Sequence, residues 1–142
     1  MAIIQTLTTS FKVEVAQGLH NFTTGTGDVF KLALYTANAD LGASTTAYTA
    51  AGESSGANYT AGGIILTNIT PSVQGTTSYW SFQDATFTNV TLTTNGALIY
   101  NSTNGNRSVA VLNFGVNITK TAQNLVITFP VNDATNAVLR IA

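Results

Sequence analysis

Cysteine is absent from this chain of 142 residues. The absence excludes disulfides, a thiolate nucleophile and cysteine ligands for zinc, so stability has to come from packing and strand pairing. Charge is scarce as well, because charged residues make up 8% of the chain against about 25% in an average soluble domain. The few Lys and Arg are spread singly, which disfavours a nucleic-acid surface. A net charge of −1 leaves little repulsion between copies and favours assembly.

Long hydrophobic runs are also missing. No stretch reaches the ~18 apolar residues that a membrane span needs. The first residues, MAIIQTLTTSFK, lack the basic and continuous apolar regions of a signal peptide. We therefore expect a soluble protein folded in a cytoplasm, without a membrane partner. The length predicts one domain, residues 1–142, around one core.

The residues that usually carry catalysis are few and scattered. His20 is the sole histidine, and a lone histidine is more often a capping or packing residue than a ligand. No G-x-S-x-G or P-loop pattern occurs. We therefore expect no enzyme activity, no cofactor and no metal site; a hydrolase would need two carboxylates to meet in space, and the spacing does not indicate which two. The acidic residues are isolated at Glu14, Asp28, Asp40, Glu53, Asp84 and Asp133.

The strongest structural pattern is a β-hairpin between Asn95 and Gly115. Its two apolar runs, Ala97–Tyr100 and Val109–Phe114, are rich in branched and aromatic residues. The pair Asn104-Gly105 between them suits the positive φ angles of a type I′ turn. We expect this hairpin to form the centre of the core.

Further short strands are predicted on both sides of the hairpin, with Pro71 and Pro130 at strand boundaries and Val116–Asn124 as a polar connection. Turn signals about every ten residues favour an all-β antiparallel sandwich; a jelly roll or barrel stays open. The remaining predicted strands are Val29–Thr36, Ile64–Ile69, Ser78–Phe82, Ala85–Val90, Leu125–Phe129 and Ala137–Ile141.

One short helix is predicted near the N-terminus, over Thr9–His20. Thr9 or Ser10 would cap it, and Phe11, Val15 and Leu19 would form its apolar stripe. The segment FKVEV also alternates with period two, so a strand is the competing interpretation.

Aromatic residues in the long polar segment Ala37–Gly63 are candidate contact residues. The rings of Tyr48 and Tyr59 either pack back onto the domain or reach a neighbouring subunit. Arg140 lies in a C-terminal strand that would pair at a sheet edge or beside a partner, and is a third candidate. A rival function is carbohydrate binding, with Tyr35, Tyr48, Tyr59 or Trp80 as stacking platforms; buried rings would favour the structural role.

The phrases FKLALYT, TAYTAAGE, NYTAGG and GALIYN resemble a family of small virion structural proteins of tailed bacteriophages. The resemblance spans nearly the whole chain and implies a particle component that is assembled in the host cytoplasm. It favours a capsid decoration (cement) protein, with a tail or head-fibre component as the alternative. The implied partners are the protein itself, as a trimer, and the major capsid protein. The resemblance implies no catalytic residues.

Overall fold

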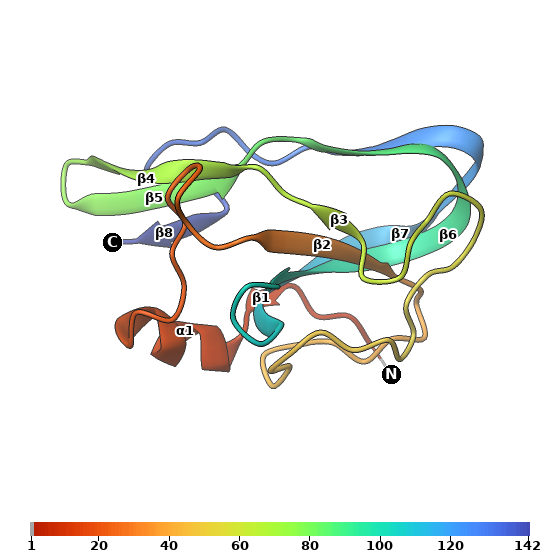
Figure 1. The fold of residues 1–142 in the computed structure, drawn as a ribbon, viewed down its shortest axis with the longest axis horizontal. Helices are drawn as coiled ribbons and strands as arrows, with labels where there is room; N and C mark the ends of the chain where they lie inside the picture. Colours follow the sequence, from red (N-terminus) through yellow and green to blue (C-terminus); the bar gives the residue numbers. More distant parts are fainter. Residues whose placement is uncertain (1) are drawn as a thin grey trace.

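The structure is a computed structural model that describes residues 2–142. It has one short helix and two antiparallel sheets, of five strands in the order β1-β7-β6-β2-β3 and of three strands in the order β4-β5-β8. The predicted all-β sandwich with one N-terminal helix is confirmed, and Figure 1 shows the two layers. The elements are β1 (Thr6–Leu7), α1 (Thr9–Ala16), β2 (Phe30–Tyr35), β3 (Ile64–Ile65), β4 (Asn68–Gln74), β5 (Thr77–Phe82), β6 (Ala85–Asn101), β7 (Arg107–Ile127) and β8 (Leu139–Ile141).

The predicted hairpin is the pair β6–β7, and it is longer than the sequence indicated. The two strands contain 17 and 21 residues and pair around Ile99 and Ala110. The segment Val116–Asn124, expected as a connection, belongs to β7, so that prediction is wrong. Its residues pair with Leu92–Thr94 of β6, because threonine and asparagine on a solvated face do not prevent a strand from extending along a neighbour.

The turn of the hairpin also differs from the predicted one. Positive φ angles occur at Gly105 (70°) and Asn106 (56°), one position later than the expected Asn104-Gly105 pair. Further along, the register shifts at Asn89 and Ala122, which both have positive φ. Such irregularities bend strands. Figure 1 shows the hairpin curving from the layer of β4 and β5 into the layer of β2.

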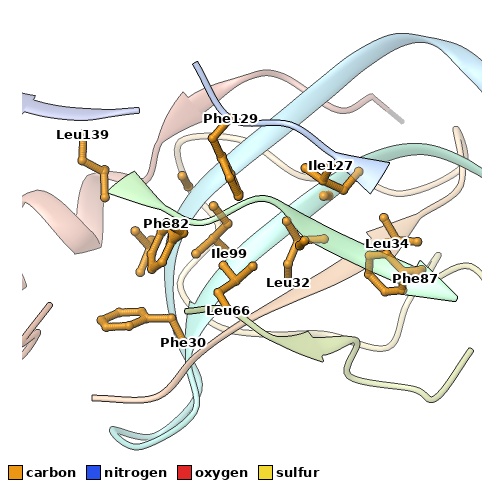
Figure 2. Packing of buried hydrophobic residues seen from close by; sticks show 14 of the residues in the cluster. Phe30, Leu32, Leu34, Leu66, Phe82, Phe87, Ile99, Ile127, Phe129 and Leu139 are labelled. Carbon is orange, nitrogen blue, oxygen red and sulfur yellow. The ribbon is translucent and has the colours of Figure 1, made fainter. Parts of the chain in front are cut away.

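The core lies between the two layers. Phe30, Leu32 and Leu34 of β2 are fully buried, as their alternation predicts. They meet Phe82 of β5 and Leu139 of β8, which come from the other sheet (Figure 2).

The opposite face of β2 is buried too, although alternation alone would make the predicted strand Val29–Thr36 half-buried. Ala33 and Tyr35 are fully buried in a second cluster with Leu98 and Val111. Residues near the N-terminus and in the 37–63 segment cover this face: Ile3 pairs with Leu41 as a parallel bridge. A second layer of chain therefore shields a sheet face that period-two alternation assigned to solvent.

The helix begins at Thr9, as predicted, but it is shorter than predicted and its N-cap lies one residue before the expected Thr9 or Ser10. Its N-cap is Thr8, whose hydroxyl accepts a hydrogen bond from the amide of Phe11 at 3.4 Å. α1 ends at Ala16, and Gly18 has φ +73°, a left-handed conformation that stops helices. Pro71 does not end a strand either. It lies within β4 at a register shift, on an outer strand where its missing N–H is tolerated.

Candidate functional site

A buried polar cluster joins α1 to the turn of the β6–β7 hairpin. The carboxylate of Glu14 accepts hydrogen bonds from Nε2 of His20 at 3.0 Å and from Arg107 at 2.8 Å. On its other side, His20 lies 3.1 Å from Nδ2 of Asn101, which also donates to Asp28 at 2.8 Å. Every charge in the cluster has a partner, as buried charges require.

The geometry fixes the tautomer of His20. The amide oxygen of Asn101 accepts hydrogen bonds from the backbone N–H groups of Thr103 and Asn104, each at 3.1 Å. Nδ2 of Asn101 is therefore the atom that faces His20 Nδ1, and the imidazole proton sits on Nε2, toward Glu14. Both ring nitrogens are engaged and the side chain has 0% exposure. His20 packs, as the sequence predicts, and it cannot reach a substrate.

A second cluster gathers tyrosines around Glu53. The carboxylate of Glu53 accepts hydrogen bonds from the hydroxyls of Tyr48 at 2.6 Å and Tyr59 at 2.7 Å, and from the backbone N–H of Gly62 at 2.8 Å. The hydroxyl of Tyr59 also accepts a hydrogen bond from the amide of Leu34 in β2. The cluster therefore ties the 37–63 segment to the main sheet.

Burial in this cluster changes the acidity of the tyrosines. Loss of hydration, together with the hydrogen bond to Glu53, raises the pKa of Tyr48 to about 12. Burial likewise raises the pKa of Tyr59, Tyr35 and Tyr100. These phenols stay protonated at neutral pH and act as hydrogen-bond donors.

The rings proposed as sugar platforms are packed within the molecule. Tyr35 and Trp80 are 0% and 6% exposed. The ring of Tyr48 stacks on Tyr100 with centroids 5.0 Å apart, and that of Tyr59 stacks on Phe87 at 5.7 Å. This arrangement favours the structural role over carbohydrate binding. Contacts of Tyr48 and Tyr59 with another subunit stay a prediction.

Neither a metal site nor a membrane span stands out in the described residues. Across residues 2–142, no three side chains of His, Cys, Asp or Glu come together as a metal-binding group. In the same range, none of the helices has the length and apolar character needed to cross a membrane.

Three hollows of the described chain lie around Leu7 and Arg140, where β1, α1 and β8 approach one another. One, of about 520 Å³, extends from Leu7 along β7 to Phe114 and Phe129. A second, of about 270 Å³, lies between α1 and β8 and reaches Trp80. A third, of about 400 Å³, lies beside the C-terminus. Leu7 and Arg140 line all three, and we refer to the three hollows together as the β1–β8 groove.

Arg140, the third candidate contact residue, is exposed at this groove and donates a hydrogen bond to the carbonyl of Thr135. The structure brings it close to neither Glu53 nor the tyrosines around it: the two sets line different parts of the fold. Sequence reasoning missed Leu7 and Lys12, which share the groove with Arg140. The walls come from opposite ends of the chain, and only the folded topology places them together.

Comparison with known proteins gave no relatives: no protein-family model, curated protein or solved structure matches this chain.

Proposed function

We propose that this protein is a structural component of a tailed-phage virion, a capsid decoration protein. In this proposal, copies associate as trimers and staple neighbouring subunits of the major capsid protein. The observation that carries the proposal is the β1–β8 groove, a large hollow bordered by two outermost strands and lined mainly by apolar side chains. Exposed apolar hollows of this kind are typical of protein contact sites.

The state of the polar groups supports a binding role over a catalytic one. The carboxylates of Glu14 and Glu53 are each held by hydrogen bonds from neighbouring side chains, and His20 is enclosed between Glu14 and Asn101. A general acid or base has to come within hydrogen-bond reach of a substrate. These groups instead fasten α1 and the 37–63 segment to the sheets.

The outer surface supports association with other proteins. Branched apolar side chains are largely exposed at Ile4 near the N-terminus, Ile65 in β3, Val116 in β7 and Ile141 in β8. Charged residues around them are few, so association with a protein lattice costs little desolvation of ions. The resemblance to small virion structural proteins of tailed phages points to the same role.

The proposal is tested on purified particles of the phage that encodes the protein. Heads and tails are separated, and the copy number in each fraction is measured by quantitative mass spectrometry. We expect the protein in heads, at a copy number comparable to that of the capsid subunits. Absence from particles would overturn the virion role, and presence in tails alone would replace decoration with the tail-component alternative.

A second measurement addresses the capsid contact itself. Heads assembled without the protein are incubated with the purified protein, and their thermal disruption is followed by light scattering. We expect bound protein to raise the disruption temperature. Heads that bind no protein would contradict the stapling role, and light scattering coupled to size exclusion would show whether the free protein is the expected trimer.

A further inference from the structure

The β1–β8 groove is bordered by one outermost strand from each sheet. β1 is the outermost strand of the five-stranded sheet, and β8 is the outermost strand of the three-stranded sheet. Among the described residues, β8 pairs with β5 alone, whereas the backbone beside β1 is partly engaged, because the N–H groups of Ile4 and Thr9 donate to Leu41 and Ala43. An outermost strand carries backbone N–H and C=O groups without ladder partners, which another strand can use. Figure 1 shows β8 between the β4–β5 layer and α1.

The groove has an apolar floor. In the part between α1 and β8 the lining includes Leu7, Phe11, Val15 and Leu139. Leu7 and Val15 are only partly buried, so apolar surface at this site is still exposed to solvent. Covering it would be favourable by about 25 cal/mol for each Å² removed from water.

The charge in the groove has one sign. Lys12 and Arg140 both line the hollow between α1 and β8, and among the described residues no Asp or Glu lines any of the three hollows. Neither cation takes part in a salt bridge found in the structure, where Glu14 pairs with Arg107 and His20. The charge of Arg140 is partly offset by Asp133, on whose carboxylate it acts. The lining of the groove is nonetheless basic, because it contains Lys12 and Arg140 and, among the described residues, no acid.

We propose that the β1–β8 groove binds an extended polypeptide segment of a partner protein, in which apolar side chains alternate with polar ones and at least one is a carboxylate. The segment adds as a strand to the free edge of β8. Its apolar side chains cover Leu7 and Val15, and its carboxylate pairs with Lys12 or Arg140. The inference rests on the proposed function and deepens it, since the partner in a particle would be the protein of the capsid lattice.

A second copy of this chain does not fit that description. Within the described part of the chain, none of the eight strands contains Asp or Glu. The acidic residues lie in α1, loops and turns, and Glu14, Asp28 and Glu53 are already bound within their own molecule. The complementary strand therefore has to come from another protein.

The test uses the purified full-length protein and a short synthetic peptide with capped ends that alternates valine with threonine and carries glutamate at two central positions. Binding is measured by calorimetry and by the emission of Trp80, which is the only tryptophan and lines the groove. We expect binding with a change in Trp80 emission. A peptide with lysine at both glutamate positions should bind at least tenfold more weakly. Equal binding of the two peptides, or no binding of the glutamate peptide, would overturn the proposal.

Variants locate the site. Lys12→Gln combined with Arg140→Gln should weaken binding of the glutamate peptide about tenfold, as expected for two partly exposed ion pairs. Lys120→Gln is the matched control, because Lys120 lines a different hollow, and should leave the affinity unchanged. Val138→Phe, which fills the groove, should abolish binding while the variant still melts cooperatively.

Two further outcomes count against the inference. Unchanged affinity in the double variant would place the peptide elsewhere, and a double variant that loses self-association would show that a second copy occupies the groove. Because these measurements use the isolated protein, their failure is distinct from failure of the virion role, which particle composition decides.

Discussion

Removing the carboxylate of Glu53 should destabilise the protein more than any other single change to its polar residues outside the core. Glu53 accepts hydrogen bonds from Tyr48, Tyr59 and the backbone of Gly62, at 2.6, 2.7 and 2.8 Å. Through them it holds the 37–63 segment against the main sheet. Glu53→Ala deletes all three bonds at once, and Glu53→Gln keeps the shape of the side chain but not its charge.

The expected loss of stability follows from the number of hydrogen bonds to Glu53 and from the burial of its side chain. A hydrogen bond to a charged group contributes about 1.5–3 kcal/mol. Glu53 is only partly buried, so water can bond to some of the groups that lose their partner in Glu53→Ala. We therefore expect this variant to lower the free energy of unfolding by about 3 kcal/mol. Glu53→Gln should cost about 1.5 kcal/mol, because the amide oxygen in place of Oε2 still accepts bonds from Tyr59 and Gly62, without the charge, while the NH₂ faces the hydroxyl of Tyr48, which has to rotate.

Urea denaturation followed by Trp80 emission measures the effect, since this single tryptophan is buried in the folded state. The midpoint should fall without a change in the slope of the transition. Asp40→Ala is the control: Asp40 is an exposed acidic residue of the same segment and should change stability by less than about 0.5 kcal/mol. If Glu53→Ala also stayed within that range, the cluster would not fasten the segment to the sheet.

Other predictions follow from burial and backbone geometry. The pKa of Tyr48 is raised to about 12, whereas an unfolded tyrosine ionises near pH 10, so stability should be full below about pH 10 and decline as the pH rises above it; urea midpoints across that range would check this. Ile99→Asp should give no cooperative melting transition because Ile99 has 0% exposure, while Ile99→Val should cost about 1 kcal/mol and still melt cooperatively. Gly63→Ala should cost about 3 kcal/mol or more of stability, since Gly63 has φ +81° and a Cβ there would lie 1.8 Å from a backbone oxygen. Gly105→Ala has open space around it and should cost about 1 kcal/mol. Equal urea midpoints for these two variants would contradict the steric argument.

The parts of the fold that could be predicted are those specified by neighbouring residues. Alternation in Phe30, Leu32 and Leu34 identifies the buried face of β2, because successive side chains of a strand point to opposite faces whatever the strand packs against. The apolar runs of the hairpin were found for the same reason. A glutamine, threonine or asparagine in a strand gives no such signal.

The misplaced boundaries depend on partners far away in the chain. Val116–Asn124 is a strand because Leu92–Thr94 of β6 supplies its hydrogen-bonding edge. The helix is capped by Thr8, not by the expected Thr9 or Ser10, because Thr8 is fully buried against Ser108, whose hydroxyl lies 2.9 Å from that of Thr8. Polar composition alone could not indicate either contact.

The candidate sites, too, were predictable only where neighbouring residues specify them. The sequence pointed to Tyr48, Tyr59 and Arg140 as residues to examine, but not to what they touch. Glu53 looked like an isolated acid, and only the folded chain brings two tyrosine hydroxyls to it. The β1–β8 groove had no local signature at all, because its walls join residues from the two ends of the chain.

The few acidic residues of this chain serve mainly in internal hydrogen bonds. In the structure, most acidic side chains accept hydrogen bonds from their own molecule, and their carboxylates fasten loops, turns and α1 to the sheets. Held at these positions, none of these acids lines the β1–β8 groove. Lys12 and Arg140 therefore meet no carboxylate in the lining of the groove, although Asp133 acts on Arg140 from outside it, and a partner can bring the complementary negative charge. The acidic residues bound in this way are Glu14, Asp28, Glu53, Asp84 and Asp133.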